Sequence, residues 1–224
     1  MKTVGILGGM GPEATVLLMQ RVLRAVPARD DADHIPLIVH QNPAVPSRIA
    51  RLIDGTGDDP GPVLAAMAQG LYAAGAQALA MPCNTAHAYA PQIIAATLLP
   101  FLDMRTATVT TLPKGRIGML ASPAVQRTGV FDAAFASAGL HPVWPQDEAP
   151  TLALIRRVKA GDTGPQAMAE LARLADDLAG RSDHLLVACT ELSLLTAALT
   201  QPFTDSLDCL VAAIVAFATG KPAV

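Results

Sequence analysis

Two cysteines, Cys83 and Cys189, stand in similar surroundings in the two halves of the chain. Each closes an apolar run and leads into a polar pair, Asn-Thr after the first cysteine and Thr-Glu after the second. These polar residue types often cap helices, and a helix N-terminus lowers the pKa of a nearby thiol. A free cysteine also packs as a small hydrophobic residue, so the rest of the chain must decide between chemistry and packing.

The cysteine motifs belong to a longer internal repeat of three paired segments. The pairs are VGILGGMGPEAT (4–15) with IGMLASPAVQRT (117–128), ALAMPCNT (78–85) with LLVACTEL (185–192), and PFLD (100–103) with PFTD (202–205). They occur in the same order with similar spacing, which indicates two related halves, 1–105 and 106–205. The amphipathic segment 206–224 is expected to form a helix that packs back on the first half. Cys209 lies in this segment without a counterpart, so we interpret it as structural.

Apolar runs and amphipathic segments alternate along both halves. Strands are predicted at 3–8, 36–41, 78–82, 116–121, 141–145 and 184–188, and helices at 13–26, 62–74, 125–138 and 165–179. This alternation predicts an α/β fold with parallel sheets. Ligands of such sheets bind beyond the carboxyl ends of the strands, which is where both cysteines stand. If the two halves face each other about a pseudo-twofold axis, the two thiols meet across one cleft.

Composition narrows the class of protein. The 224 residues are 51% hydrophobic and carry a formal net charge of −3, without a basic cluster of the kind that binds nucleic acid. No segment resembles a signal peptide or is long enough to span a bilayer. The three cysteines form neither a disulfide framework nor a zinc-site spacing. We therefore expect a cytoplasmic protein with reduced thiols, no metal, and neither nucleic-acid nor membrane partners.

Two thiols on opposite sides of a small substrate suit a proton transfer with two bases. One thiolate removes a proton from carbon, and the opposite thiol returns a proton to the other face, which inverts the stereocentre without a metal or organic cofactor. The α-proton of an amino acid is weakly acidic. The site must therefore stabilise the developing carbanion through the substrate carboxylate, by fixed hydrogen-bond donors and positive groups.

Four motifs in a fixed order resemble the aspartate/glutamate racemase superfamily, most nearly its aspartate racemase branch. They are GGMGP (8–12), PSR (46–48), PCNTAH (82–87) and CTEL (189–192), and the resemblance covers essentially the whole chain. It implies two similar flavodoxin-like domains related by pseudo-twofold symmetry, with the active site in the cleft between them. It also implies racemisation of a small amino-acid substrate without a cofactor, and a homodimer.

The resemblance also implies roles for individual residues. Cys83 and Cys189 match the two catalytic acid/base thiols. The residues that match substrate-binding positions are Met10, Arg48, Asn84, Thr85, Ser122, Lys159, Thr190 and Glu191. Among these, Asn84 and Thr85 would hold the α-carboxylate, while Arg48 and Lys159 would supply positive charge to a dicarboxylate. His87, one helical turn after Cys83, is a further candidate, with helix capping or core packing as its structural alternative.

Some positions depart from the family pattern. Glutamate racemases carry Asp-Ser-Gly after the first strand, where this chain has Gly8-Gly9-Met10, and they place histidine where this chain has Glu191. Both differences argue against a glutamate racemase. Val125 and Ala188 stand where related chains often have threonine and glycine, which leaves the substrate preference open. Aspartate is the substrate that we expect.

Other interpretations remain beside this one. GMGPEA (9–14) fits a dinucleotide-binding pattern, but Pro12 removes a backbone donor and no acidic residue ends the second strand. The alternatives of the same class are a broad-specificity amino-acid racemase and a dicarboxylate isomerase or decarboxylase. A different class is a non-catalytic module that binds small dicarboxylates and uses the thiols as ligands or redox sensors. Arg156 and Arg157 compete with Lys159 as the active cation, and 53–62 is either a lid or a linker.

Overall fold

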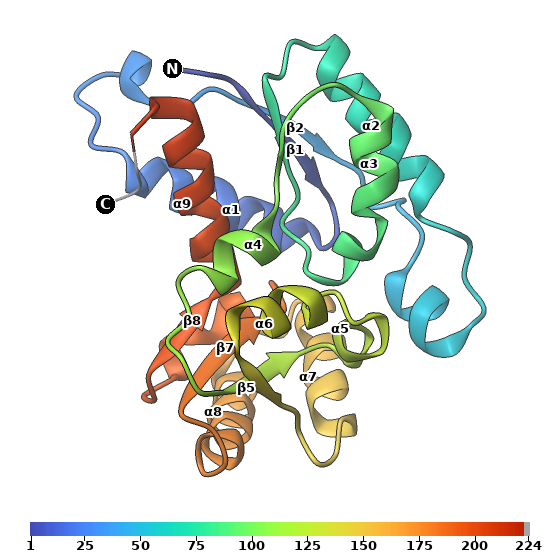
Figure 1. Ribbon diagram of the computed structural model, residues 1–224, viewed down its shortest axis with the longest axis vertical. Helices are drawn as coiled ribbons and strands as arrows, with labels where there is room; N and C mark the ends of the chain where they lie inside the picture. The colour runs from blue at the N-terminus through green and yellow to red at the C-terminus, as the bar shows by residue number, and fades with distance from the viewer. Residues whose placement is uncertain (222–224) are drawn as a thin grey trace.

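The apolar runs around residues 4–8 and 116–121 are buried inner strands of two separate parallel sheets. The computed structural model describes residues 1–221 (Figure 1). The first sheet has the order β2-β1-β3-β4 and the second the order β6-β5-β7-β8. The strands are β1 Val4–Gly8, β2 Leu37–Gln41, β3 Ala78–Ala80, β4 Phe101–Leu102, β5 Arg116–Ala121, β6 His141–Val143, β7 His184–Ala188 and β8 Phe203–Asp205. The two sheets therefore share one strand order, as the internal repeat predicts.

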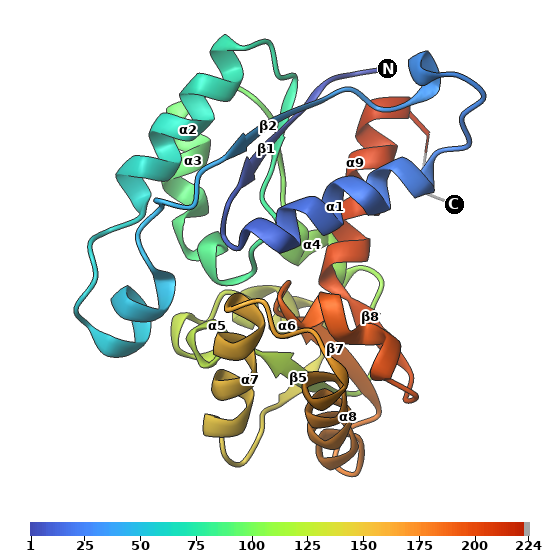
Figure 2. The ribbon, with the colours of Figure 1, turned by 180° about the vertical axis from the view of Figure 1, so that it is seen from behind.

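Helices connect the strands and cover both faces of each sheet (Figures 1 and 2). The α-helices are α1 Pro12–Ala25, α2 Gly61–Ala73, α3 Ala90–Ala96, α4 Met104–Val109, α5 Pro123–Thr128, α6 Asp132–Ala138, α7 Ala149–Lys159, α8 Pro165–Ala179 and α9 Ser206–Thr219. Short 3-10 turns occupy Asp31–Asp33, Thr85–Tyr89 and Leu192–Ala198, and Ala50–Asp54 forms a π-helical turn. None of the described helices is long and apolar enough to cross a membrane.

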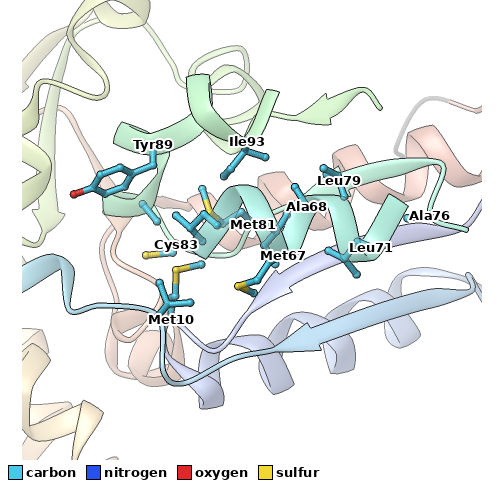
Figure 3. Close-up of a cluster of buried hydrophobic side chains, with 14 residues drawn as sticks. Met10, Met67, Ala68, Leu71, Ala76, Leu79, Met81, Cys83, Tyr89 and Ile93 are labelled. Atoms are coloured by element: carbon cyan, nitrogen blue, oxygen red, sulfur yellow. The ribbon is translucent and has the colours of Figure 1, made fainter. Parts of the chain in front are cut away.

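Each sheet lies between two layers of apolar side chains. In the first half, one cluster joins β1 and β3 to α2 and α3, and a second joins the other face to α1 and α9. Figure 3 shows the first of these clusters, with Met10 and Cys83 together at one end and Ala76 at the other. Cys83 is thus anchored in the core at the carboxyl end of a central strand.

The last helix, α9, returns to the first half after the chain has completed the second sheet. Leu207, Leu210 and Ile214 of this helix are fully buried against β1 and α1. The helix is shorter than the predicted segment 206–224, because Gly220 adopts a left-handed conformation with φ 71° directly after Thr219. Residues 222–224 of that prediction lie outside the described residues.

Three other sequence predictions need correction. The helix predicted over 125–138 is two helices, because Gly129 adopts a left-handed conformation, with φ 60°, between α5 and α6. Strands β4 and β8 were not predicted, since each has three residues or fewer and lies at a sheet edge. Helices α3, α4 and α7 were not predicted either, although α7 carries Lys159 at its end.

The turn after β1 brings backbone close to backbone. Gly9 has φ 94°, and a Cβ atom there would lie 2.4 Å from the backbone carbon of Asn42. Only glycine tolerates both conditions. The chain then enters α1 with Pro12 in its first turn, where a missing N–H costs no helical hydrogen bond. The turn containing Met10 and Gly11 therefore stands beyond the carboxyl end of the first sheet.

Candidate active site

A cavity of about 560 Å³ lies between the two halves. The first half lines it with the turn after β1, with the segment around Arg48, and with Cys83 and Thr85. The second half contributes Ser122 at the start of α5, the end of α7, and the turn after β7. A Cβ atom on Gly11 would lie 3.4 Å from Oε1 of Glu191, so the first-half turn closely approaches the second-half carboxylate. The cavity thus lies beyond the carboxyl ends of both sheets, as expected for parallel sheets.

Cys83 and Cys189 both line this cavity from equivalent places in the two sheets. Cys83 follows β3 and is 7% exposed, while Cys189 follows β7 and is 6% exposed. Both strands are inner strands next to the one that begins its half. Because each thiol comes from a rigid strand end on its own side, the two sulfur atoms face one space from different halves of the molecule.

The thiol of Cys189 lies against charged groups. Its Sγ donates a hydrogen bond to Oε2 of Glu191 over 3.2 Å, and Oε1 of Glu191 forms an ion pair with Nζ of Lys159. Burial, reinforced by the negative charge of Glu191, raises the pKa of Cys189 well above its usual value. Burial lowers the pKa of Lys159, but Glu191 and the two thiols outweigh this effect and raise it. Cys189 is therefore a protonated thiol at neutral pH, beside a charged ammonium.

This finding corrects the expectation that a helix N-terminus lowers the pKa of Cys189. The segments that follow the cysteines are 3-10 turns, and neither begins with a side-chain cap. Asn84 and Thr190 were expected to cap helices, but Asn84 donates to Ser206 and Thr190 donates to the carbonyl of Pro82. For Cys189, burial in a low-dielectric site exceeds any favourable contribution from backbone N–H groups.

The side chains that follow Cys83 in sequence are uncharged, although the charge of Lys159 acts on this thiol as well as on Cys189. Thr85 takes the place that Glu191 takes after Cys189. His87 is fully buried, with Nδ1 2.8 Å from the carbonyl oxygen of Cys83, and Nε2 accepts a hydrogen bond from the backbone N–H of Met104. Since Nε2 accepts, Nδ1 carries the proton and donates. Burial lowers the pKa of His87 to about 4, so its ring is neutral and supports the backbone of Cys83.

The remaining predicted residues divide into two groups. Those that line the cavity, besides the two cysteines, are Met10, Arg48, Thr85, Ser122, Lys159 and Glu191. Asn84, Thr190 and His87 do not line it, because their polar groups are directed to other parts of the protein. The structure therefore places eight of the eleven candidate residues at the cavity, counting both thiols.

Arg48 is held by the segment that precedes it. Its Nη1 donates to the carbonyl oxygens of Val45 and Pro46 over 3.3 and 2.9 Å. Its buried Nε has no hydrogen-bond partner among the described residues. The guanidinium thus lines the cavity in a fixed orientation and keeps donor capacity for an anion.

Arg156 and Arg157 are excluded as alternatives to Lys159. They share helix α7 with it, but neither lines the cavity. Arg156 lies 3.9 Å from a carboxylate oxygen of Asp54, and Arg157 pairs with Asp162 at 2.6 Å. Of the three neighbouring cations, Lys159 alone reaches the thiols.

Two cavity residues with polar side chains were missed by sequence reasoning. Glu13 and Ser47 line the cavity, and both lie within or beside the motifs GGMGP and PSR. Position next to a motif was the available signal, but neither residue type identifies a role by itself. Cys209, by contrast, agrees with its structural interpretation, because it is buried on α9 outside the cavity, 3.4 Å from the hydroxyl of Thr111. No cluster of potential metal ligands occurs among residues 1–221.

Comparison with known proteins relates this arrangement to a family of racemases. The sequence model of the Asp/Glu/Hydantoin racemase family matches residues 7–214. The broad-specificity amino-acid racemase RacX of Bacillus subtilis (strain 168) is 26% identical over 220 residues, which cover 92% of this chain and 94% of RacX.

Solved structures give the same result. The aspartate racemase of Picrophilus torridus superposes with a TM-score of 0.89 and 27% identity, covering 98% of this chain and 95% of its own. The glutamate racemase of Francisella tularensis subsp. tularensis SCHU S4, solved with D-glutamate, shares the fold with a TM-score of 0.66 and 14% identity, covering 98% and 81%. The chain belongs to the Asp/Glu/hydantoin racemase family, whose members are isomerases that do not depend on pyridoxal phosphate.

Proposed function

We propose that this protein racemises a small amino acid, with aspartate as the principal substrate, by using Cys83 and Cys189 as acid and base on opposite faces of the α-carbon. One observation carries the proposal: two cysteines from equivalent positions in the two halves line a single cavity. A buried structural thiol needs no such partner, whereas inversion at carbon needs proton donors and acceptors on both faces.

The reaction balances without any further reagent. The thiolate on one side takes the α-proton, and the electron pair of the broken C–H bond passes into the α-carboxylate. The opposite thiol then gives its proton to the other face of the α-carbon, and the product is the mirror-image amino acid. The two sulfur atoms have exchanged protonation states, and exchange with water restores them. Cys189, whose pKa is raised by burial and by Glu191, begins this cycle as the proton donor.

The cavity offers the groups that this reaction requires. The carbanion is stabilised where the α-carboxylate is neutralised, and fixed donors act strongly in a water-excluded site. Thr85 and the turn around Gly11 supply neutral donors, and Lys159 and Arg48 supply positive charge. Lys159 is paired with Glu191, so Arg48 is the cation with free donor capacity for a second carboxylate. This distribution favours aspartate over neutral amino acids.

A broad-specificity racemase is the second candidate, and it rests on a particular observation. The relative RacX is described as a broad-specificity amino-acid racemase, and its identity to this chain, 26%, is close to the 27% of the Picrophilus torridus aspartate racemase. Sequence identity therefore does not choose between the two substrate ranges. We also propose a homodimer, because the family resemblance implies one. Light scattering of the purified protein tests this part of the proposal.

The deciding experiment follows the α-protons of amino acids in heavy water by proton NMR. The panel contains both enantiomers of aspartate, glutamate, alanine and lysine. We expect both enantiomers of aspartate to lose the α-proton signal and to interconvert. Exchange across the whole panel would support the broad-specificity racemase instead. Binding of aspartate without any exchange would refute catalysis and leave the binding-module interpretation.

A further inference from the structure

The residues that follow the two cysteines connect the two cysteine loops to each other. The hydroxyl of Thr190, next to Cys189, donates a hydrogen bond of 3.0 Å to the carbonyl oxygen of Pro82, the residue before Cys83. Thr190 is 1% exposed and does not line the cavity. One direct bond therefore joins the loop of the second half to the loop of the first.

A second connection runs in the opposite direction through α9. Nδ2 of Asn84, the residue after Cys83, donates to Oγ of Ser206 over 2.9 Å. That hydroxyl in turn donates to the carbonyl oxygen of Val187 over 2.9 Å, two residues before Cys189. Asn84 is 2% exposed and Ser206 is fully buried. The loop of Cys83 is thus held through its own Asn84 and through Thr190. The loop of Cys189 is held through its own Thr190 and through Ser206.

Both connections lie where hydrogen bonds constrain geometry strongly. They are buried, so water does not compete for their donors and acceptors, and an unpaired partner there would be costly. Hydrogen bonds are also directional and have a narrow range of lengths. Two such connections, which attach on both sides of each cysteine, resist sliding and separation of the two loops.

We propose that Thr190, Asn84 and Ser206 are positioning residues that fix the separation of the two catalytic thiols. This inference rests on the proposed function, since only a reaction that uses both thiols requires a fixed separation between them. Both sulfur atoms must reach one carbon from opposite faces, and a misplacement of about 1 Å in a reacting group can reduce a rate by about 100-fold. The inference assigns Asn84 and Thr190 a role outside substrate binding.

Loss of positioning has a signature that differs from loss of binding or of stability. In heavy water, a carbanion formed by one thiol has two fates. Capture by the opposite thiol gives deuterated, inverted product, whereas return from the first thiol, after its proton has exchanged with solvent, gives deuterated starting enantiomer. If the opposite thiol is displaced, capture slows and return does not. The ratio of inversion to exchange then falls.

The test compares three variants with L-aspartate and D-aspartate as probes. Thr190→Val removes the hydroxyl at nearly constant volume, and Thr190→Ser keeps it. Thr196→Val is the matched control, because the Thr196 hydroxyl donates over 3.2 Å to the carbonyl of Ser193 within its own turn and connects no loops. Proton NMR gives the exchange rate, chiral chromatography gives the inversion, and circular dichroism checks that each variant is folded.

We expect Thr190→Val to reduce the ratio of inversion to exchange by about tenfold, with KM changed by less than about twofold. Thr190→Ser should restore the ratio, and Thr196→Val should behave like the wild type. If Thr190→Val does not fold, Ser206→Ala breaks the second connection and should lower the same ratio.

Three results would overturn the inference. An unchanged ratio in folded Thr190→Val or Ser206→Ala would show that these hydroxyls do not position the thiols. A large rise in KM at an unchanged ratio would make Thr190 a substrate-binding residue. If the wild-type protein exchanges no α-proton, the proposed function fails and this inference fails with it, which distinguishes the two cases.

Discussion

The two halves of this protein present the same side chain, a cysteine thiol, in different electrostatic surroundings. Cys83 and Cys189 follow equivalent inner strands, but two residues later the first half has Thr85 and the second has Glu191. Four residues after each cysteine stand buried His87 and Ser193. The repeat therefore supplies two thiols in equivalent places. The positions that differ between the halves place the carboxylate of Glu191 beside Cys189 and the ring of His87 against the backbone of Cys83.

The reaction itself limits what this asymmetry can do. Two enantiomers have equal free energy in water, so the ratio of their kcat/KM values must be one at every pH. Differences between the two thiols can therefore change kcat and KM for each enantiomer separately. The value of kcat/KM must stay the same for both enantiomers. Any account that makes one direction of racemisation more efficient than the other contradicts thermodynamics.

The largest expected difference between the halves concerns two equivalent aspartates. Asp205 has a side chain that is 1% exposed, and its cation is Arg21 from the other half, at 2.6 Å. Asp103 is 24% exposed and pairs with Arg105, two residues away. Arg21→Met leaves a buried carboxylate without its cation and should cost about 3–5 kcal/mol of stability. Arg105→Met is the matched control and should cost about 1 kcal/mol or less.

Urea unfolding at neutral pH measures both free energies. Arg21 also donates to the backbone carbonyl of Ser193, near Cys189, so its loss removes a hydrogen bond between the halves as well as the cation of Asp205. Equal losses in the two variants would show that the connection between the halves contributes no more than a surface ion pair.

The second difference is a pH dependence of stability that originates in the first half. His87 has a folded pKa of about 4, below its ordinary 6.5, because it is buried. Between these values the unfolded chain binds a proton that the folded chain does not, so stability falls as pH falls through this window. The loss is on the order of 3 kcal/mol. Ser193, the counterpart of His87, has no such titration.

His87→Asn should remove this contribution, since asparagine keeps a donor for the carbonyl of Cys83 but does not titrate. The free energy of unfolding of wild type and variant, measured from about pH 7 to pH 4, gives the two slopes. The variant is expected to be less stable at neutral pH and to lose less stability on acidification. Parallel slopes would assign the pH dependence to other groups.

Lys159 tests the charge beside Cys189. Lys159→Met leaves Glu191 without its cation and removes a positive charge that lowers the pKa of the Cys189 thiol. We expect kcat/KM to fall about 100-fold, equally for both enantiomers. Arg157→Met changes a cation of the same helix that pairs with Asp162 outside the cavity, and serves as the control. A similar fall in both variants would make the effect structural.

Glu191→Gln should produce the smallest and most selective change. Because the charge of Glu191 helps to raise the pKa of Cys189, its removal lowers that pKa, and the positive charge of Lys159 lowers it further. For the enantiomer from which Cys189 takes the proton, the rise of kcat with pH should move to lower pH. The profile for the other enantiomer should move less. A shift to higher pH would contradict the assignment of Glu191.

The repeat explains how much of this was predictable from sequence. The two similar parallel-sheet halves, and the candidate roles of both cysteines and Lys159, followed from paired motifs and from the resemblance that they carry, because strand ends and motif residues are local features. The hydrogen-bond partners of Asn84 and Thr190 were not predicted, since they lie 122 and 108 residues away and depend on how the halves dock. The raised pKa of Cys189 was missed because burial in the tertiary structure is not a property of the local sequence.

The central claim is that the two halves supply acid and base to opposite faces of one carbon. Its most direct test is the exchange of the α-proton in heavy water by Cys83→Ser and Cys189→Ser, with each enantiomer of aspartate separately. We expect neither variant to racemise, and each to exchange the α-proton of one enantiomer only, a different one in each variant. Racemisation by either variant, or exchange of the same enantiomer by both, would contradict the claim.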